Sequence, residues 1–269
     1  MNSNMRIEPN DIISDADVKS FMRLVVEQAQ MHPIIYKYLT YNSGCQMLQN
    51  HNIQFTRGDK LNDIEDLNIS KFNLDAPREF CKECGIDMSL INNKLTERAN
   101  EFKSFGVCSL GISPLNSVLW NRYTRSESEI EDGICIGLNQ NKAINALTKQ
   151  GLKTACIVVR YKQSVSNTIP WLALSSSSPV KIFAGYQFFA LKNSDPWEPE
   201  QEIRLVYTNI MTEEFHRIIL PKDCFESVYF GKDMNTEQRQ SVGQILSQHF
   251  PRIKRIPLTE DAFTEKRKA

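Results

Sequence analysis

Apolar residues are grouped along the chain into short runs that are rich in Val, Ile, Phe and Tyr, separated by polar stretches. This enrichment is typical of β-strands bounded by loops. Two such runs stand near the beginning, and residues 106–231 contain seven more. The runs are residues 34–39, 52–56, 106–110, 133–138, 154–161, 180–191, 202–209, 216–220 and 227–231.

Helical spacing of apolar residues appears between and before these runs. In residues 15–30 six apolar side chains fall near one helical face, Asp15 or Ser14 can cap the N-terminus, and Pro33 ends the pattern. Strands outnumber helices and do not alternate strictly with them, which predicts an α+β fold rather than a doubly wound sheet. The other expected helices are 42–50, 88–103, 115–125, 140–150 and 236–249.

Composition adds limits on the class of protein. The 269 residues are 41% hydrophobic and 24% charged, which excludes a disordered chain, a collagen-like fibre and a coiled-coil rod. Since 32 basic residues balance 32 acidic ones, a nucleic acid would have to be bound by a local basic patch. The N-terminus lacks the apolar segment of a secretory signal, and seven scattered cysteines indicate a reducing compartment. We expect a cytoplasmic protein that does not use a membrane.

Several familiar sites are absent or incomplete. Cys81 and Cys84 form a single C-x-x-C motif, but a structural zinc site needs four ligands, and neither a second C-x-x-C nor a closely spaced histidine pair is present. We therefore expect no metal at these cysteines. The chain has no G-x-S-x-G motif and no Gly-rich phosphate loop, which argues against a serine hydrolase, a P-loop enzyme and a Rossmann enzyme.

Acidic residues are concentrated in the segment 197–207, WEPEQEIRLVY. Glu198, Glu200 and Glu202 share one face if this segment is extended, and three carboxylates there repel one another unless a cation or ligand lies among them. Arg204 would lie on the same face and could pair with Glu202. Two interpretations remain open. The segment is either a solvated strand edge with a surface ion pair, which would contribute little to stability, or a functional site.

A series of short motifs stands in a fixed order along residues 34–231. The series resembles a bacterial family known only as a domain of unknown function, whose members read Y-K-Y, L-N-D, M-W-x-x-Y, G-hydrophobic-G and W-x-x-E-x-E-x-R. The chain departs from that pattern at Leu119, where the family has Met, and in LNDIED at 61–66, where the family has LNDPFE. The matching residues are Tyr36, Lys37, Tyr38, Leu61, Asn62, Asp63, Trp120, Tyr123, Gly133, Gly137, Tyr161, Trp197, Glu200, Glu202, Arg204, Leu220, Pro221, Phe230 and Gly231.

The opening strand, helix and second strand also resemble the start of an ADP-ribosyltransferase. Enzymes of that superfamily place a basic residue on the first strand, a tyrosine or serine in the middle, and a late glutamate that is often in E-x-E. The resemblance implies Lys37, or its rival Tyr38, in the first position, Tyr123 in the middle, and Glu202 last, preceded by Glu200. It also implies an α+β split β-sheet sandwich with flanking helices, to which the N-terminal helix would be an addition.

The same resemblance implies NAD as the donor substrate and a role for each residue. Release of nicotinamide develops positive charge on the ribose, and a carboxylate such as Glu202 would stabilise that charge. Lys37 would orient the nucleotide as a point charge. Glu200 would position or deprotonate the acceptor. Tyr123 or Trp120 would stack on nicotinamide, although core packing is the alternative interpretation of each aromatic residue.

These observations predict an N-terminal helical extension at 1–33, an ADP-ribosyltransferase-like domain at 34–258 and a tail at 259–269. The expected function is an NAD-dependent ADP-ribosyltransferase, a bacterial toxin of a toxin–antitoxin or anti-phage system. Its acceptor would be RNA, DNA or protein, and an antitoxin protein is a possible partner. Two alternatives remain: a non-catalytic nucleotide- or nucleic-acid-binding sensor, and a nuclease that holds Mg²⁺ with Glu198, Glu200 and Glu202.

Overall fold

The computed structural model describes residues 27–28, 30–63, 65–73, 75–85, 87–125, 132–166, 169–170, 185 and 187–258. Glu27, Gln28 and Gln30 are helical, but the rest of the expected helix at 15–30 lies outside the described residues, as do the tail at 259–269 and most of the extension at 1–33. The domain boundaries therefore stay predictions.

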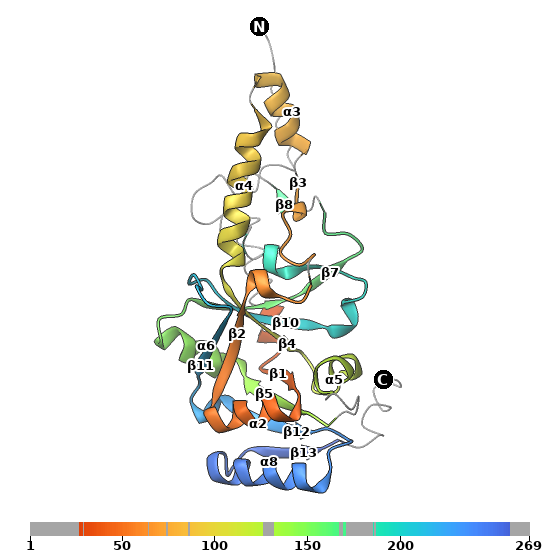
Figure 1. Ribbon diagram of the computed structural model, residues 1–269, viewed down its shortest axis with the longest axis vertical. Helices are drawn as coiled ribbons and strands as arrows, with labels where there is room; N and C mark the ends of the chain where they lie inside the picture. Colours follow the sequence, from red (N-terminus) through yellow and green to blue (C-terminus); the bar gives the residue numbers. More distant parts are fainter. Residues whose placement is uncertain are drawn as a thin grey trace.

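A nine-stranded, mainly antiparallel sheet forms the frame of the molecule (Figure 1). Its strand order is β11-β2-β4-β1-β5-β12-β13, and β10 pairs with both β4 and β6. Strands β12 and β13 pair in parallel, and the other pairings between the described strands of this sheet are antiparallel. The strands are β1 (Ile34–Leu39), β2 (Asn52–Arg57), β4 (Gly106–Gly111), β5 (Ile134–Asn139), β6 (Thr154–Val158), β10 (Glu202–Tyr207), β11 (Phe215–Ile219), β12 (Phe225–Phe230) and β13 (Lys254–Pro257).

The sheet is split along one edge of β4. The other edge pairs with β10 over its whole length, from Glu202 opposite Gly111 to Tyr207 opposite Gly106. On the split edge, β1 pairs only at the Gly111 end and β2 only at the Gly106 end. Residues 108–110 in the middle of this edge have no strand partner among the described residues. An opening between β1 and β2 follows directly from this arrangement.

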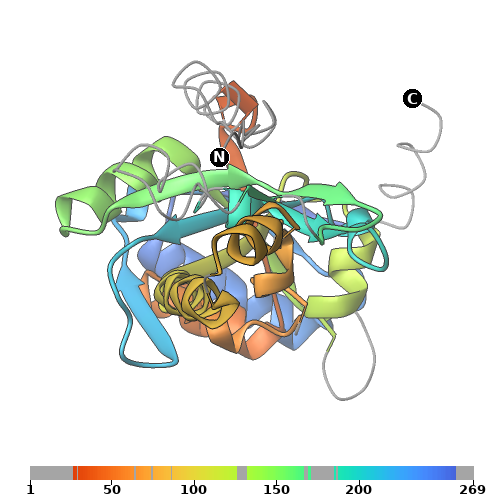
Figure 2. The ribbon, with the colours of Figure 1, turned by 90° about the horizontal axis from the view of Figure 1, so that it is seen from above.

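Helices cover the sheet and close one side of this opening. Helix α2 (Tyr41–Asn50) connects β1 to β2; Thr40 caps its N-terminus, and Met47 and Leu48 on its inner face are buried. Helix α8 (Thr236–His249) packs against α2 and starts with a capping box made by Asn235 and Gln238. Helices α5 (Ser117–Tyr123) and α6 (Gln140–Lys149) lie on other sides of the frame (Figures 1 and 2).

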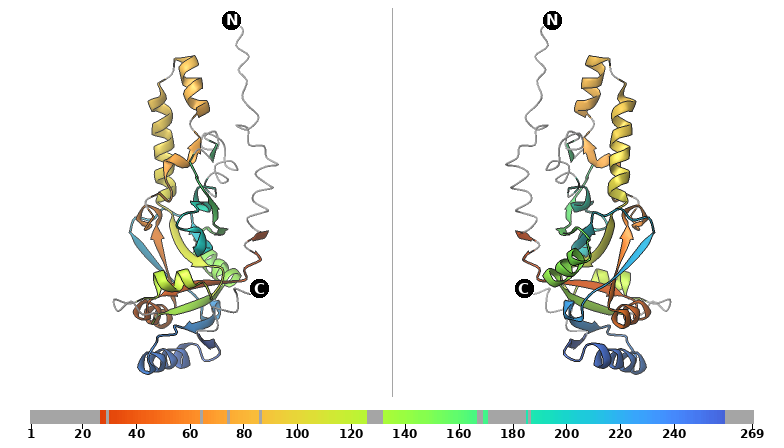
Figure 3. Two further views of the ribbon diagram at one scale, coloured as in Figure 1. Left: turned by 90° about the vertical axis from the view of Figure 1, so that its right-hand side faces the viewer. Right: turned by 90° about the vertical axis from the view of Figure 1, so that its left-hand side faces the viewer.

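A helical pair extends away from the sheet. Helices α3 (Asp75–Cys84) and α4 (Met88–Lys103) pack together and project at the end of the molecule opposite α8, as the side views show (Figure 3). The base of α4 covers a second core, in which stacked and edge-on aromatic rings meet. Two short parallel pairs lie nearby: β3 (Phe72–Asn73) with β8 (Ile169–Pro170), and β7 (Arg160–Lys162) with β9 (Leu191–Asn193).

The α+β class predicted from the sequence is confirmed, and β1, α4 and α8 begin and end where the pattern placed them. The strand expected at 180–191 is wrong for its described part, because residues 187–190 are helical and only Leu191 begins a strand. A short apolar run cannot by itself distinguish a buried helix from a strand. The expected strand at 154–161 is interrupted at Val159, which separates β6 from β7. Within the described ranges, no helix has the length and apolar character needed to cross a membrane.

Candidate active site

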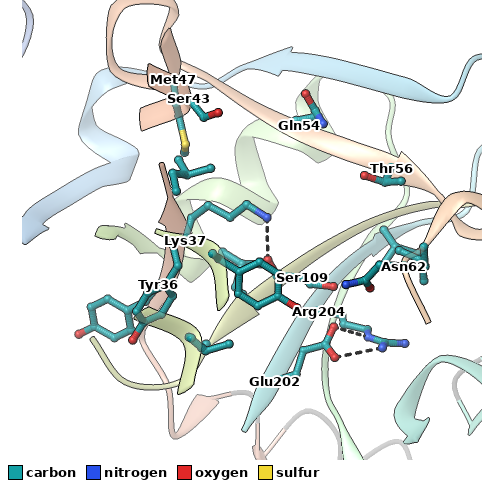
Figure 4. A pocket seen from close by; sticks show the side chains of 18 of the residues that line it. Tyr36, Lys37, Ser43, Met47, Gln54, Thr56, Asn62, Ser109, Glu202 and Arg204 are labelled. Carbon is teal, nitrogen blue, oxygen red and sulfur yellow. Dashed lines mark hydrogen bonds and ion pairs between the residues drawn. The ribbon is translucent and has the colours of Figure 1, made fainter. Parts of the chain in front are cut away.

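A cleft of about 430 Å³ lies where β1 and β2 separate from β4 (Figure 4). Residues of β1, α2, β2, β4, α5, β9, β10 and β11 line it, together with Glu200 before β10 and residues 60–62 and 66 of the segment after β2. Five candidate residues from the sequence are among them: Lys37, Tyr38, Tyr123, Glu200 and Glu202. They come from three distant parts of the chain, near positions 37, 123 and 200. The folding of the sheet therefore brings these side chains to one place.

Lys37 extends from β1 across the split in the sheet. Its Nζ donates a hydrogen bond to the carbonyl oxygen of Ser109 at 2.9 Å, in the middle of β4 where no strand pairs with it (Figure 4). An ammonium group has three donors, so two remain for a ligand or water. The Lys37 side chain therefore lines the cleft, as its expected role requires.

Tyr38 also contributes to the cleft wall, but its hydroxyl already makes two hydrogen bonds to the backbone. Its hydroxyl donates to the carbonyl oxygen of Ser113 at 2.5 Å and accepts from the backbone N–H of Asn116 at 3.2 Å. Its ring meets Trp120 edge-on, with ring centroids 5.5 Å apart. Gly111 lies beside this contact, where a Cβ would be 2.7 Å from Leu119 Cδ1 and 3.2 Å from the Tyr38 ring. Tyr38 is therefore placed to fix the end of β1 against α5.

Trp120 does not line the cleft. It is fully buried behind Tyr38, and its indole N–H donates to the carbonyl oxygen of Pro114 at 2.9 Å. The core interpretation of this residue fits the structure, and a direct stacking contact with a ligand in the cleft does not. Trp120 lies on the inner side of α5, which packs on β1, whereas Tyr123 at the end of this short helix is 36% exposed.

Glu202 opens β10 and is buried, with 4% of its surface exposed. Arg204 Nε donates to its Oε1 at 2.7 Å and Arg204 Nη2 to its Oε2 at 3.1 Å, while Lys192 Nζ donates to Oε2 at 3.1 Å. Burial alone would raise the pKa of Glu202, but the two cations outweigh burial and hold the pKa below its usual value. The interpretation of Glu202 and Arg204 as a surface ion pair is therefore wrong, because both side chains are buried.

Glu200 lies beside Glu202, but the backbone between them is not the extended strand that was expected. Residues Glu198–Glu200 form a 3-10 turn, and Gln201 adopts a left-handed conformation with φ of 48° before β10 begins. Glu200 is buried, whereas Glu198 is exposed. The expectation that all three glutamates share one extended face is thus wrong for Glu198. A turn followed by a strand brings only Glu200 and Glu202 together.

The carboxylate of Glu200 connects both sides of the cleft. Its Oε1 accepts hydrogen bonds from the hydroxyl of Tyr123 at 2.9 Å and from Arg122 at 2.8 Å, and its Oε2 lies 3.6 Å from Lys192 Nζ. Burial and the neighbouring Glu200 charge raise the pKa of Tyr123, which keeps the hydroxyl protonated as a donor. Arg122 and Lys192 both lie over the ring of Trp197, which gives this tryptophan a structural role at the rim.

Three buried charged residues were missed by the sequence analysis. Asp66 makes a two-pronged ion pair with Arg204, and Lys71 donates to Asp66 Oδ1 at 3.3 Å. The third is Lys192, which bridges Glu200 and Glu202. Burial alone would raise the pKa of Asp66, but Arg204 and Lys71 hold it well below its usual value. Asp66 belongs to the 61–66 segment, in which the chain departs from the family pattern, and no local pattern marks Lys71 or Lys192 as buried.

The remaining candidate residues lie away from this cleft. Cys81 and Cys84 are on helix α3, one buried and one exposed, rather than in a loop. Within the described residues, no group of three His, Cys, Asp or Glu side chains is arranged to hold a metal ion. The expectation that these two cysteines bind no metal stays a prediction.

The chain was compared with known proteins at three levels. No protein-family model matches it, so the resemblance to the family of unknown function stays unconfirmed, and no curated protein sequence matches. Among solved structures, DarT from Thermus sp. 2.9 in complex with NAD+ is similar, with 14% identity, a TM-score of 0.37, and coverage of 86% of this chain and 98% of that one. DarT in complex with ADP-ribosylated ssDNA gives 14% identity, a TM-score of 0.36, and coverage of 87% and 97%.

Proposed function

We propose that this protein is an NAD-dependent ADP-ribosyltransferase. The observation that carries the proposal is the meeting of Lys37, Tyr123, Glu200 and Glu202, from four separate elements, in one cleft at the split in the sheet. These are the basic, aromatic and acidic positions that the resemblance to ADP-ribosyltransferases implied. The proposal rests on these residues rather than on overall similarity to another structure.

Glu202 is suited to stabilise the cation that forms when nicotinamide leaves. Its lowered pKa keeps it charged at neutral pH, and Arg204 fixes the plane of the carboxylate. Each carboxylate oxygen has two lone pairs. Arg204 Nε takes one on Oε1, which leaves the other for a ribose hydroxyl. A charge held in place before the reaction costs no reorganisation at the transition state.

The neighbouring side chains supply the rest of the site. The two unused donors of Lys37 would bind the diphosphate, and the half-exposed ring of Tyr123 would pack on the nicotinamide or its ribose. Glu200 would orient the acceptor nucleophile or take its proton as the new bond forms. Its contacts with Tyr123 and Arg122 fix where this carboxylate points.

We further propose a nucleic acid, RNA or DNA, as the acceptor, with a protein acceptor as the alternative, and a toxin role in which an antitoxin protein would neutralise the activity. The DarT structures contain NAD+ and ADP-ribosylated ssDNA, which recommends these molecules as first probes. The deciding experiment incubates the protein with NAD labelled in the adenosine and with cell lysate. Separate nuclease and protease treatments then show which macromolecule carries the label. Labelled material sensitive to nuclease supports the proposal, and no labelled product together with no nicotinamide release contradicts it.

A magnesium-dependent nuclease fits the cleft less well. The oxygens of Glu200 and Glu202 are already bound by Arg122, Lys192 and Arg204, and a divalent cation would have to compete with these three cations. Glu198, the third acidic residue of that alternative, points to solvent. The non-catalytic sensor is distinguished by NAD consumption, which it would not show.

A further inference from the structure

The outer wall of the cleft is a two-stranded ribbon whose two faces differ. Strands β2 and β11 pair in antiparallel register, with Thr56 opposite Phe215, Gln54 opposite Arg217 and Asn52 opposite Ile219. Directly opposed residues point to the same side of a sheet. Asn52, Gln54, Thr56, Phe215 and Arg217 line the cleft. We call these five side chains, together with Ile219 opposite Asn52, the ladder.

The opposite face of the ribbon explains how the ladder is held. Ile53, Phe55 and Ile218 alternate with the ladder residues and are buried in the main core, with 0%, 0% and 4% of their surfaces exposed. His216 lies on this inner side too, where its ring bonds to the hydroxyl of Tyr207. The ladder is therefore presented on a rigid support, and changes to its outward side chains should leave the fold intact.

The ladder carries exposed groups that the proposed chemistry does not use. Phe215 is 43% exposed and Ile219 is 66% exposed. Among the described residues, Tyr123 and Phe215 are the large aromatic side chains that are exposed, and both line the cleft. The two lie on elements at opposite sides of it, α5 and β11 (Figures 1 and 2). An aromatic ring left in solvent at a cleft mouth is a surface for stacking.

The cleft lining has more cations than carboxylates, and Lys60 and Arg217, two of the cations that are not paired with a described carboxylate, lie at this wall. Each lining carboxylate is ion-paired with a buried cation, Lys192 or Arg204, whereas Lys60 and Arg217 at the rim make no ion pair with any described residue. The side-chain amides of Asn52 and Gln54 likewise make no hydrogen bond within the described part of the chain. The charged lining residues are Lys37, Lys60, Lys192, Arg204 and Arg217 against Asp66, Glu200 and Glu202.

We propose that the ladder is the binding surface for a single-stranded segment of the acceptor nucleic acid. Phe215 stacks on a base, Arg217 and Lys60 contact phosphates, and the amides of Asn52 and Gln54 contact base edges. Aromatic rings interleaved with cations and amides are the means by which proteins hold unpaired bases. The five residues of β11 span about 14 Å, a length suited to a few nucleotides rather than to a duplex. This assignment rests on the proposed function and specifies the substrate of the same cleft.

The test measures binding of a fluorescently labelled 12-nucleotide single strand, as DNA and as RNA, by anisotropy without NAD. We expect Phe215→Ala to weaken binding about tenfold, since stacking of one base accounts for a change of that order. Arg217→Gln should weaken it most at low salt, because it removes a phosphate contact. Matched controls are Leu90→Ala, an exposed apolar residue on α4, and Arg252→Gln, an exposed arginine after α8. Both controls should bind as the wild type does.

NAD hydrolysis to nicotinamide and ADP-ribose, measured without an acceptor, separates this proposal from the proposed function. The ladder variants should hydrolyse NAD at the wild-type rate and keep the wild-type thermal midpoint. Ladder variants that bind the oligonucleotide normally would overturn the assignment. So would a wild type that consumes NAD but binds no oligonucleotide, which would indicate a protein acceptor. Weakened binding in the ladder variants of a protein that never consumes NAD would support the ladder while overturning the transferase.

Discussion

Arg204 contacts both carboxylate oxygens of Glu202, through Nε at 2.7 Å and Nη2 at 3.1 Å, from a position two residues further along β10. Residues two apart on a strand share a face, so the pair is set by the strand itself. Arg204 also forms an ion pair with Asp66, and Asp66 forms a second ion pair with Lys71. The candidate catalytic carboxylate is thus the end of a chain of buried charges that lines the cleft.

Replacement of Glu202 by Gln should remove NAD-dependent activity while keeping the shape of the side chain. The expected loss is about 10²–10³ in rate, because the charge that faces the developing cation is absent. The variant should also unfold more easily, since Arg204 and Lys192 lose a buried counter-charge. Nicotinamide release and thermal unfolding report the two effects. Glu198→Gln, at the exposed neighbouring position, should change neither, and a folded, fully active Glu202→Gln protein would exclude this glutamate from the mechanism.

Lys37→Ala should weaken NAD binding mainly through the loss of charge. The deficit should be largest at low ionic strength and shrink as salt screens the remaining contacts of the wild type. Titration calorimetry with NAD at several salt concentrations measures this dependence. Lys254→Ala, at an exposed lysine on β13, is the control. A deficit that does not change with salt would assign Lys37 a packing role instead.

Tyr123 offers a ring and a hydroxyl whose contributions can be measured separately. Tyr123→Phe keeps the ring but removes the hydrogen bond to Glu200, so it should leave NAD affinity nearly unchanged and lower the rate of transfer. Tyr123→Ala also removes the ring and should weaken NAD binding in a manner nearly independent of salt. Comparing KM and kcat for the two variants checks this. Equal NAD affinity for Tyr123→Ala and wild type would show that the ring does not contact the nucleotide.

Asp66 should make stability depend on pH in the acidic range. A carboxylate whose pKa is lower in the folded than in the unfolded protein stabilises the fold above its ordinary pKa, about 4, and this stabilisation is lost as the pH falls through the folded value. Asp66→Asn should therefore be less stable at pH 7, by about 3–5 kcal/mol, and lose less stability on acidification. Denaturant unfolding at pH 7 and pH 3 measures both. Asp59→Asn, whose ion pair with Arg57 is exposed, should cost at most about 1 kcal/mol.

The sequence predicted the frame of this protein better than the details of its cleft. Strand β1 and helices α4 and α8 follow from local apolar periodicity, which reports directly on burial. The helical residues 187–190 could not be predicted in this way, because Phe188 and Phe189 suit a buried helix as well as a strand. The two glutamates were found because they are adjacent in sequence, although a turn at Gln201 rather than an extended strand aligns them.

The buried cations show what a single sequence does not reveal. Lys71 is fully buried, and burial lowers its pKa to about 8 despite the opposing charge of Asp66. Nothing near Lys71 in the sequence distinguishes it from a surface lysine, because its partners Asp66, Phe188 and Leu191 include residues more than a hundred positions away. Long-range pairing of charges depends on tertiary structure, which local patterns do not encode.

The attachment of β1 and β2 to opposite ends of β4 limits how such a cleft can be resized. Insertion of one residue into β4 would turn every following side chain to the other face and move the partner of Arg204 out of register. The opening can therefore be lengthened only in increments of two residues, about 6.8 Å each. A larger substrate is more simply accommodated at the rim, in the segment after β2 and in β11, which can vary while the frame stays constant.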